Sequence, residues 1–512
     1  MKLADLFSGQ SVALPLDAAS VEISSLAVDS RRVTPGALFA ALPGALADGA
    51  DFAGQAARAG AAAILSPRKL DLPVPCVIAP EPRAAFARAA ARFHGNPSSR
   101  FNLLGVTGTN GKTTTTYLVE QLATALEQRA GVIGTVETRW PGNSRPSTHT
   151  TPESHELQAL LAEMARAPID VAAIEVSSHA LAQDRVTGCR FAGAAFTNLT
   201  RDHLDYHGTL EAYFDAKARL FRELLPGSAL SVINLDDPRC ARLAAELLES
   251  ERPVLGFTVR GARAPRGAML LAAENLDCTL EGLSFNARLE RPEQRAGAPD
   301  AEASRIPVTS PLLGAHNAEN LLAAMGLLIG TGAHLPMLAR VAGQAHGAPG
   351  RLQRIPDPCE RVVLVDYAHS DDALARVLDA IAFAAGTEPR IVCVFGCGGD
   401  RDQGKRPLMG KAAGARAHLT IATSDNPRTE DPLAIMNDAL VGIRRVDVPH
   451  VVEPDRQAAI RRALKEAREG DIVILAGKGH ETYQVLKDKT IDFDDRAVAR
   501  EVLKGYGYHK TQ

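Results

Sequence analysis

One glycine-containing segment constrains this chain more than any other. Residues 105–114 read GVTGTNGKTT and stand between an apolar run at 101–106 and a segment with helical spacing at 113–128. Backbone N–H groups at the start of a helix bind anions, and Gly108 and Gly111 would let the backbone close around phosphate. The order of strand, glycine loop, lysine and helix predicts a phosphate-binding loop. Val106 departs from the commoner G-x-x-x-x-G-K-[ST] spacing, so an ordinary strand–helix turn is the alternative.

Within this loop, Lys112 is expected to reach the terminal phosphates of a nucleotide, and Thr113 or Thr114 to hold Mg²⁺. The adjacent Lys-Thr-Thr favours phosphate binding over the plain turn.

Length and composition set broad limits on the class of protein. A chain of 512 residues suggests about three domains. A net charge of −3 argues against a nucleic-acid-binding protein that depends on phosphate attraction. No apolar run is long enough for a membrane span, and the first ten residues do not resemble a signal peptide. Seven scattered cysteines indicate free thiols rather than a zinc site, so a cytoplasmic protein is expected.

The pattern along the chain predicts an α/β fold. Apolar strands at 169–176, 191–199 and 229–234 alternate with helical patterns, and the alternation resumes after residue 349. Turn residues at 94–102 and a hinge near 348 divide the chain into segments 1–99, 100–348 and 349–512. Residues 291–305 are polar and predict a loop.

Two further strand ends carry candidate metal ligands. Glu175 ends an apolar strand, where a carboxylate is costly unless it has a partner such as a metal. Asp202, His203, Asp205 and His207 crowd what we expect to be a single loop after another strand. Oxygen ligands with one imidazole suit Mg²⁺ or Mn²⁺ better than zinc. An exposed strand-end glutamate and ordinary surface residues are the alternatives.

Nine motifs occur in order along the chain, and together they resemble the Mur ligase family of ATP-dependent, amide-forming enzymes of peptidoglycan synthesis. They are GTNGKTT, HTTPES, EVSSHALAQDR, TNLTRDHLDYHG, GAHNAENLLAA, VDYAHS, FGCGGDRDQGKRPLMG, SDNPRTEDP and AGKGHETYQ. The resemblance implies a first domain that binds a UDP-N-acetylmuramoyl dipeptide, a central domain that resembles P-loop ATPases, and a Rossmann-like last domain. It also implies that ATP phosphorylates a carboxylate of the substrate. A single chain acting as a monomer is expected.

The resemblance assigns the central machinery by position. Lys217, which alone would read as a solvated charge on a helix, matches a lysine that the family carbamylates with CO₂ to N6-carboxylysine. The family's metal ligands correspond to Thr113, Glu175, His203 and carbamylated Lys217, with His207 as the alternative to His203. Lys112, Lys217, Glu175 and His203 are the implied catalytic residues.

Binding residues follow in the same way. For ATP, the resemblance implies Gly108, Thr109, Asn110, Gly111, Lys112, Thr113, Thr114, Asn317, Asn320, Arg351, Asp366 and His369. For the UDP-linked substrate it implies Val28, Ser30, Ala45, Leu46, Ala47, Thr150, Thr151, Ser177, Gln183 and Arg185.

The last domain is expected to select the incoming amino acid. Ligands of parallel sheets bind beyond the carboxyl ends of the strands, where Arg401 and Arg428 suit a carboxylate and Asp425, Asn426 and Glu481 suit an ammonium group. Diaminopimelate carries both groups at its far end, whereas lysine carries only the amine. The family's diaminopimelate motif matches residues 425–428, so the implied pocket contains Arg401, Asp425, Asn426, Pro427, Arg428, Gly477 and Glu481.

Rival functions use the same scaffold. It could add L-lysine, add glutamate to a folate, or serve as a non-catalytic nucleotide-binding relative. Arg428 of the 425–428 motif, together with the HTTPES and EVSSH motifs, distinguishes the chain from the first two. The presence of Lys112, Thr113, Glu175, His203 and Lys217 argues against the last.

Overall fold

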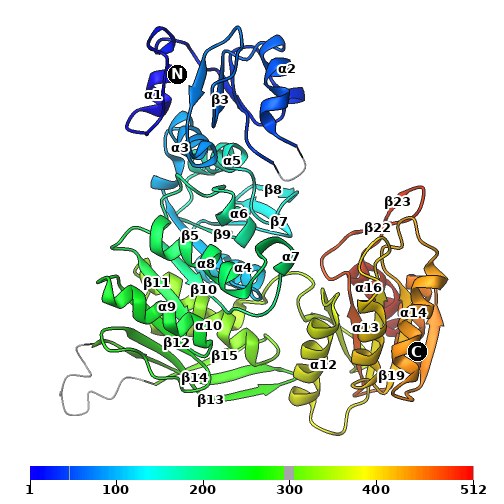
Figure 1. Ribbon diagram of the computed structural model, residues 1–512. Helices are drawn as coiled ribbons and strands as arrows, with labels where there is room; N and C mark the ends of the chain where they lie inside the picture. Colours follow the sequence, from blue (N-terminus) through cyan, green and yellow to red (C-terminus); the bar gives the residue numbers. More distant parts are fainter. Residues whose placement is uncertain (45–46, 293–304, 511–512) are drawn as a thin grey trace. The chain divides into compact units, whose positions relative to one another are not determined.

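The computed structural model describes residues 1–44, 47–292 and 305–510. The chain divides into two compact units. The described part of the first unit contains Met1–Ala272, residues 288–292 and Asn320–Leu338, and the second contains Ala273–Ala287, Arg305–Glu319 and the chain from Ala339 onward. Figure 1 gives the element labels. Most of the predicted loop at 291–305 lies outside the described residues.

The N-terminal sheet of the first unit is parallel. Its strands pair in the order β1 (Ser25–Ala27), β2 (Ala37–Ala40), β3 (Ala63–Ser66) and β4 (Cys76–Ile78). Alternate residues face opposite sides. Leu38 and Leu65 pack with α1 (Leu3–Phe7) and α3 (Pro82–Phe93), whereas Phe39 and Ile64 pack with α2 (Ala53–Arg58).

The central sheet of the first unit carries the glycine loop. Its strands follow the order β13-β12-β11-β10-β5-β9-β6-β7-β8. The bounds are β5 (Asn102–Thr107), β6 (Ala130–Ile133), β7 (Glu137–Trp140), β8 (Asn143–Pro146), β9 (Val171–Glu175), β10 (Gly193–Phe196), β11 (Leu230–Asn234), β12 (Val254–Thr258) and β13 (Met269–Thr279). From β13 to β6 the neighbouring strands are parallel, and β7 and β8 continue as antiparallel strands.

This strand order explains the position of the loop. Strand β5 lies between β9 and β10, with Val106 opposite Glu175 and Thr107 opposite Phe196. The carboxyl ends of these three strands therefore meet around residues 108–111. Helices of this part of the chain are α4 (Lys112–Ala125), α5 (Ser154–Arg166), α6 (Ser178–Ala182), α7 (Leu204–His207), α8 (Leu210–Arg219), α9 (Pro238–Glu249) and α10 (Ala315–Gly330).

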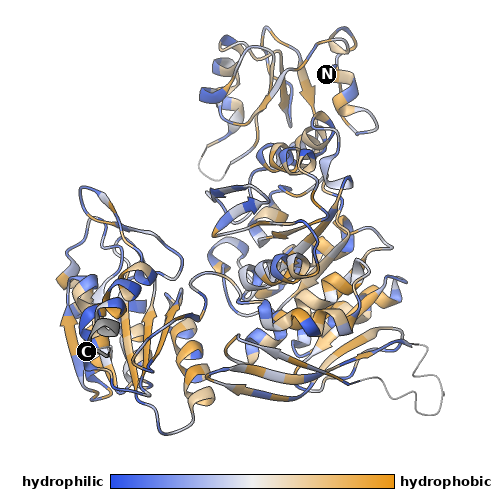
Figure 2. Cartoon of the chain, turned by 180° about the vertical axis from the view of Figure 1, so that it is seen from behind, coloured by the Kyte–Doolittle hydropathy of each residue, from blue (hydrophilic) through white to orange (hydrophobic). Residues whose placement is uncertain are grey.

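The second unit is built on another largely parallel sheet. Its order is β16-β17-β21-β18-β19-β20, with β16 antiparallel to β17. The strands are β16 (Gln353–Ile355), β17 (Val362–Asp366), β18 (Ile391–Cys397), β19 (Leu419–Ser424), β20 (His450–Glu453) and β21 (Ile472–Ala476). Its inner strands are mostly apolar (Figure 2), as expected for a sheet covered on both faces, and the carboxylate of Asp366 stands at the carboxyl end of β17.

Helices cover both faces of this sheet. One face packs against α12 (Asp371–Ala385), α13 (Lys405–Gly414) and α14 (Pro432–Arg444), and the other against α15 (Arg456–Glu466) and α16 (Asp495–Lys510). The second unit also contains part of α11 (Leu335–Val341) and most of β14 (Gly282–Glu290), as far as Ala287. β14 pairs antiparallel with β15 (Ile306–Ser310), and β22 (Tyr483–Val485) pairs antiparallel with β23 (Thr490–Asp492). The α/β prediction with parallel sheets is confirmed.

Candidate active site

The glycine loop follows β5 directly and leads into the first turn of α4. Gly108 and Gly111 have φ of 145° and 86°, and Gly111 caps the helix. A Cβ atom at Gly108 would lie 1.9 Å from Thr197 Oγ1, and one at Gly111 would lie 2.2 Å from Asn320 Oδ1. Both positions therefore require glycine for two reasons. The backbone has a positive φ, and a side chain would collide with a neighbouring residue.

Lys112 folds back over this loop. Its Nζ donates hydrogen bonds to the carbonyl oxygens of Gly108 (2.9 Å) and Thr109 (2.8 Å). Asn198 holds the loop from the next strand, because its Oδ1 accepts from Asn110 N at 2.9 Å and its carbonyl accepts from Thr109 N. The loop is thus fixed between the ends of β5 and β10.

Glu175 is the buried carboxylate beside the loop, with 1% of its surface exposed. It accepts hydrogen bonds from Thr113 Oγ1 (2.9 Å), Thr135 Oγ1 (3.0 Å) and Thr135 N (2.7 Å). These donors satisfy a charge whose burial would otherwise be costly. Sequence reasoning missed Thr135, because nothing in the chain around it signals a partner 40 residues away.

Lys217 lies under the same loop, on α8. It is 1% exposed, its Nζ donates to Gly108 O at 2.8 Å, and it stands 4.6 Å from the centre of the Tyr213 ring. Burial, reinforced by the neighbouring Lys112 charge, holds the pKa of the Lys217 amine well below its usual range. Lys217 is therefore not a solvated surface charge, which is what its helix pattern alone suggests.

The segment 202–207 is not a single loop. Leu204–His207 forms a helical turn that begins after His203, whose φ is 52°. His207 Nε2 lies 3.0 Å from Ser178 Oγ, so this imidazole is engaged by α6. The His203 ring contacts the His179 ring, with centroids 4.8 Å apart, and its Nε2 lies 3.5 Å from Asp202 Oδ2.

The residues fit a magnesium ion only in part. Across residues 1–44, 47–292 and 305–510, no three His, Cys, Asp or Glu side chains are grouped to hold a metal. Thr113 and Glu175 do place adjacent oxygens beside the phosphate loop, which suits Mg²⁺. An unmodified lysine repels a cation, so Lys217 could contribute only after conversion to a carbamate.

The residues expected to bind the UDP-linked substrate in the central domain are brought together. Thr151 Oγ1 donates to Glu175 O at 2.7 Å and accepts from Ser177 N at 3.1 Å. Arg185 donates to Thr151 O (3.0 Å) and to Gln183 Oε1 (2.7 Å). Thr150 Oγ1 lies 3.0 Å from Thr135 Oγ1, which in turn donates to Glu175. One network therefore joins this group to the loop.

In the N-terminal sheet, Ser30 is buried and its hydroxyl donates to Gln55 Oε1 at 3.1 Å. Val28 packs against the core of this sheet, and Ala47 is exposed. Ala45 and Leu46 lie outside the described residues.

In the second unit, the expected ATP residues cluster at the end of β17. Asp366 accepts hydrogen bonds from Leu352 N (2.7 Å) and Ala368 N (2.8 Å). Burial raises the pKa of this carboxyl group, and Arg351 opposes the rise. The Arg351 guanidinium lies 4.7 Å from the centre of the Tyr367 ring, and His369 Nδ1 lies 2.9 Å from Tyr367 O. Asn317 is buried on α10, where its Nδ2 donates to Leu313 O at 2.8 Å.

The residues expected to bind the amino acid come together at the carboxyl ends of β18, β19 and β21. Asn426 Nδ2 donates to Glu481 Oε2 at 2.9 Å. Arg428 has a φ of 53°, and its Nη1 donates to Gly399 O at 2.7 Å. A Cβ atom placed on Gly398 would lie within 4 Å of both the Arg428 and the Arg401 side chains. The two arginine side chains are therefore both next to Gly398.

A lysine that sequence reasoning missed stands among the acceptors of this pocket. Lys478 Nζ lies 3.3 Å from Asp425 Oδ1, 3.1 Å from Asn426 Oδ1 and 3.1 Å from Glu481 Oε2, and the side chain is fully buried. Its position between Gly477 and Glu481, two residues expected in the pocket, could have indicated that Lys478 belongs to the same site.

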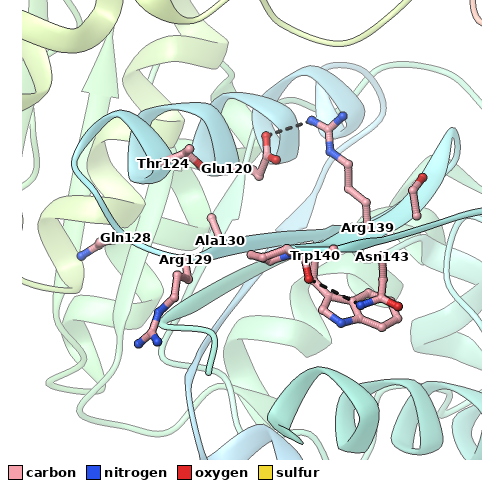
Figure 3. Close-up of a pocket in the computed structure, with 11 residues that line it drawn as sticks. Glu120, Thr124, Gln128, Arg129, Ala130, Arg139, Trp140 and Asn143 are labelled. Atoms are coloured by element: carbon pink, nitrogen blue, oxygen red, sulfur yellow. Dashed lines mark hydrogen bonds and ion pairs between the residues drawn. The ribbon is translucent and has the colours of Figure 1, made fainter. Parts of the chain in front are cut away.

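A cavity of about 580 Å³ lies elsewhere in the first unit (Figure 3). Its lining comes from α4 and the β6–β8 strands and includes Arg129, Trp140 and Asn143. None of the expected site residues lines it. Among the described residues, no helix is long and apolar enough to cross a membrane.

Comparisons with known proteins agree along the whole chain. Family models match residues 22–94 (Mur ligase family, catalytic domain), 106–328 (Mur ligase middle domain) and 350–479 (Mur ligase, glutamate ligase domain). Proteins named UDP-N-acetylmuramoyl-L-alanyl-D-glutamate--2,6-diaminopimelate ligase are 49% identical in Solibacter usitatus, over 100% of both chains, and 45% identical in Gloeobacter violaceus, over 94% of both. A solved structure of the same name is 36% identical, with a TM-score of 0.70 over 94% of this chain and 95% of the other. The chain therefore belongs to the Mur ligase family.

Proposed function

We propose that this chain is the ATP-dependent ligase that joins meso-2,6-diaminopimelate to the D-glutamate of UDP-N-acetylmuramoyl-L-alanyl-D-glutamate in peptidoglycan precursor synthesis. Two relatives named for this reaction match 100% and 96% of the chain. The reaction takes two steps. The γ-carboxylate of the D-glutamate attacks the γ-phosphorus of ATP, which gives an acyl phosphate and ADP. The diaminopimelate amine then attacks the acyl carbon, loses a proton, and expels inorganic phosphate.

The observation that carries this proposal is the convergence of Lys112, Lys217 and the Thr113–Glu175 pair on one glycine loop. Phosphoryl transfer depends mainly on positioning and on neutralising charge at the transferring group. Lys112 Nζ donates to the loop carbonyl oxygens of Gly108 and Thr109 and would turn toward the phosphate of a bound nucleotide. The helix N-terminus at Gly111 adds backbone N–H donors.

Lys217 is proposed to act as a carbamate. Its Nζ would attack the carbon of CO₂, forming an N–C bond and releasing a proton, so that a cation becomes an anion. The low pKa of the buried amine supports this step, because the neutral amine is the reactive form. Mg²⁺ or Mn²⁺, which supplies positive charge next to phosphate when bound, would be held by Thr113, Glu175, His203 and this carbamate.

The carbamate can be tested without an activity assay. Carbon-13-labelled bicarbonate should give a carbamate resonance in the wild-type protein that is missing from Lys217→Met. A resonance that persists in this variant would assign it to another amine and remove Lys217 from the proposal.

The remaining binding residues are proposed by position. ATP would contact the loop residues Gly108, Thr109, Asn110 and Thr114, and Asn317, Asn320, Arg351, Asp366 and His369. The UDP-linked substrate would contact Val28, Ser30, Ala47, Thr150, Thr151, Ser177, Gln183 and Arg185. The proposed domains are 1–99, 100–348 and 349–512.

Selection of diaminopimelate is proposed to rest on the pocket of the second unit. Arg428 and Arg401 would bind the carboxylate at the far end of the amino acid, and Asp425, Asn426 and Glu481 its ammonium group, with Pro427 and Gly477 shaping the backbone. Lysine lacks that carboxylate and would forgo the charge-assisted contact with Arg428, whose side chain is half-buried and donates to Gly399 O.

Phosphate release from ATP tests the reaction. The UDP-linked dipeptide is supplied in bicarbonate-containing buffer, and meso-diaminopimelate, L-lysine and no amino acid are compared. Release with meso-diaminopimelate alone is expected, and Lys112→Met should abolish it. Lys465→Met, on the exposed side of α15, is the matched control. Equal release with L-lysine would contradict the proposed pocket, and no release with either amino acid from folded protein would contradict the ligase.

We also place the reaction in the cytoplasm and the active species as a monomer, since ATP and the UDP-linked precursor are cytoplasmic substrates and the proposed ligands come from one chain. Light scattering of the purified protein tests the second point.

A further inference from the structure

Lys478 is a buried cation whose hydrogen-bonding capacity is fully used. An ammonium group has three N–H donors, and Asp425 Oδ1, Asn426 Oδ1 and Glu481 Oε2 lie within 3.1–3.3 Å of its Nζ. The lysine side chain is 0% exposed, whereas those of Asp425 and Glu481 are 11% and 15% exposed. The lysine therefore lies behind the acceptors, and the acceptors reach solvent.

The backbone around Lys478 fixes this inward direction. Gly477 and Gly479 on either side have φ of 114° and 52°, values that side-chain-bearing residues rarely adopt. The chain leaves the end of β21 and turns at both glycines, so the side chain between them points beneath residues 425 and 426. Glu481 N donates to Lys478 O at 2.9 Å, which closes the turn.

Lys478 also determines which way the Asn426 amide faces. Its ammonium and Val485 N, at 3.0 Å, are both donors aimed at Oδ1. Because two donors require an acceptor at that position, Nδ2 must face Glu481 Oε2, as observed. Without the lysine, Asn426 Oδ1 would lose one of the two donors that orient the amide.

The charges in the pocket give the lysine a second effect. Asp425 and Glu481 together carry two negative charges, and Lys478 neutralises one. The remaining single negative charge matches one ammonium group and leaves Arg428 able to attract a carboxylate nearby. Two uncompensated carboxylates would repel that carboxylate, while still attracting a bare amine.

We propose that Lys478 is a positioning residue for the incoming amino acid, which orients Asn426 and Glu481 and sets the pocket charge so that an ammonium–carboxylate end is preferred over a lone amine. This inference rests on the proposed function, in which the pocket takes the far end of meso-diaminopimelate. Lys478 touches the pocket residues and acts through them.

The test replaces the cation by an uncharged side chain of similar length, Lys478→Met, with Lys465→Met as the control for loss of an exposed lysine. The kcat/KM for meso-diaminopimelate is expected to fall about 100-fold, mainly through KM. The KM values for ATP and the UDP-linked dipeptide should stay within about twofold, because their proposed ligands are other residues. The preference for meso-diaminopimelate, measured as its kcat/KM divided by that for L-lysine, should fall by about tenfold or more.

A second variant keeps the test decisive if Lys478→Met folds poorly. In Lys478→Met/Glu481→Gln, one carboxylate is removed together with the cation, so the pocket keeps a single negative charge. If the lysine acts through Glu481, adding Lys478→Met to Glu481→Gln should lower kcat/KM for meso-diaminopimelate much less than the same change does in the wild type.

Three results would overturn the inference. The first is an unchanged KM and an unchanged preference in Lys478→Met. The second is a parallel loss of kcat and of affinity for all substrates together with a lower melting temperature, which indicates a purely structural lysine. The third is full additivity in the double variant. Failure of the proposed function is separate, because it would appear as no diaminopimelate-dependent phosphate release by the wild-type protein.

Discussion

Replacing Gly111 by alanine probes whether the short glycine loop depends on a close contact. Gly111 has a φ of 86°, and a Cβ atom there would meet Asn320 Oδ1 at 2.2 Å. Asn320 is 5% exposed and its Oδ1 lies 3.4 Å from Thr115 Oγ1, so its side chain has little room to move aside. Gly142, in the β7–β8 turn, has a similar φ of 79° but nothing within 4 Å of its Cβ position.

This pair separates backbone strain from steric contact. A left-handed backbone costs a side-chain-bearing residue about 1–2 kcal/mol, which both variants should lose. Overpacking a buried site adds about 1–3 kcal/mol, and only Gly111→Ala should lose this amount. We therefore expect the free energy of unfolding to fall by about 2–5 kcal/mol in Gly111→Ala and by about 1–2 kcal/mol in Gly142→Ala.

Urea unfolding followed by tryptophan fluorescence measures the difference. Trp140 is the single tryptophan of the chain and is buried on β7, in the sheet that carries the loop. The KM for ATP should also rise in Gly111→Ala, by about 100-fold if the loop amides shift by about 1 Å, and stay unchanged in Gly142→Ala. Equal unfolding midpoints for the two variants and an unchanged KM would refute the steric reasoning.

Three other variants test the site. In CO₂-free buffer, Lys217→Met should raise the free energy of unfolding, and in bicarbonate-containing buffer the same variant should release no phosphate. The native pKa of Lys217 is depressed, so at pH values below the ordinary lysine pKa of 10.5 the unfolded chain binds more protons than the native chain. The gain in unfolding free energy should therefore shrink as the pH rises toward 10.5. A gain that does not change with pH in urea titrations would contradict this account. Arg428→Met should lower kcat/KM for meso-diaminopimelate about 100-fold and leave L-lysine unaffected, and a parallel fall for both amino acids would remove the arginine from the pocket. Arg456→Met should cost about 3–5 kcal/mol in urea unfolding because it leaves Asp495 buried and unpaired, and Arg456→Met/Asp495→Leu should recover most of the loss if that reason is right.

The features of the site that could be predicted from the sequence are those encoded in short stretches. The loop at 108–111 and the helix from Lys112 follow from glycine spacing and helical periodicity, and they form as expected. Glu175 was recognisable because a carboxylate at the end of an apolar strand must find partners. The ends of the second sheet were recognisable in the same way, since parallel strands present their carboxyl ends together.

The remaining features depend on contacts between distant residues. Thr135 is recruited to Glu175 across 40 residues, and Lys478 meets Asp425 across 53. The turn at 204–207 is helical although its charged residues suggested a loop, and His207 contacts Ser178 instead of standing beside His203 as an equivalent ligand. None of these outcomes leaves a local pattern in the chain, because each depends on which strand ends are neighbours.

The two buried lysines show how neighbours decide the chemistry of one residue type. Lys217 faces a carbonyl oxygen, an aromatic ring and a second ammonium group, and its pKa is depressed toward the neutral, nucleophilic amine. Lys478 is within hydrogen-bonding distance of two carboxylates and an amide oxygen, which hold its side chain in place. The first environment suits a lysine that must react with CO₂, and the second suits one that must hold other side chains in place. Exchanging these roles by mutation would require exchanging the neighbours, since the lysines themselves are identical.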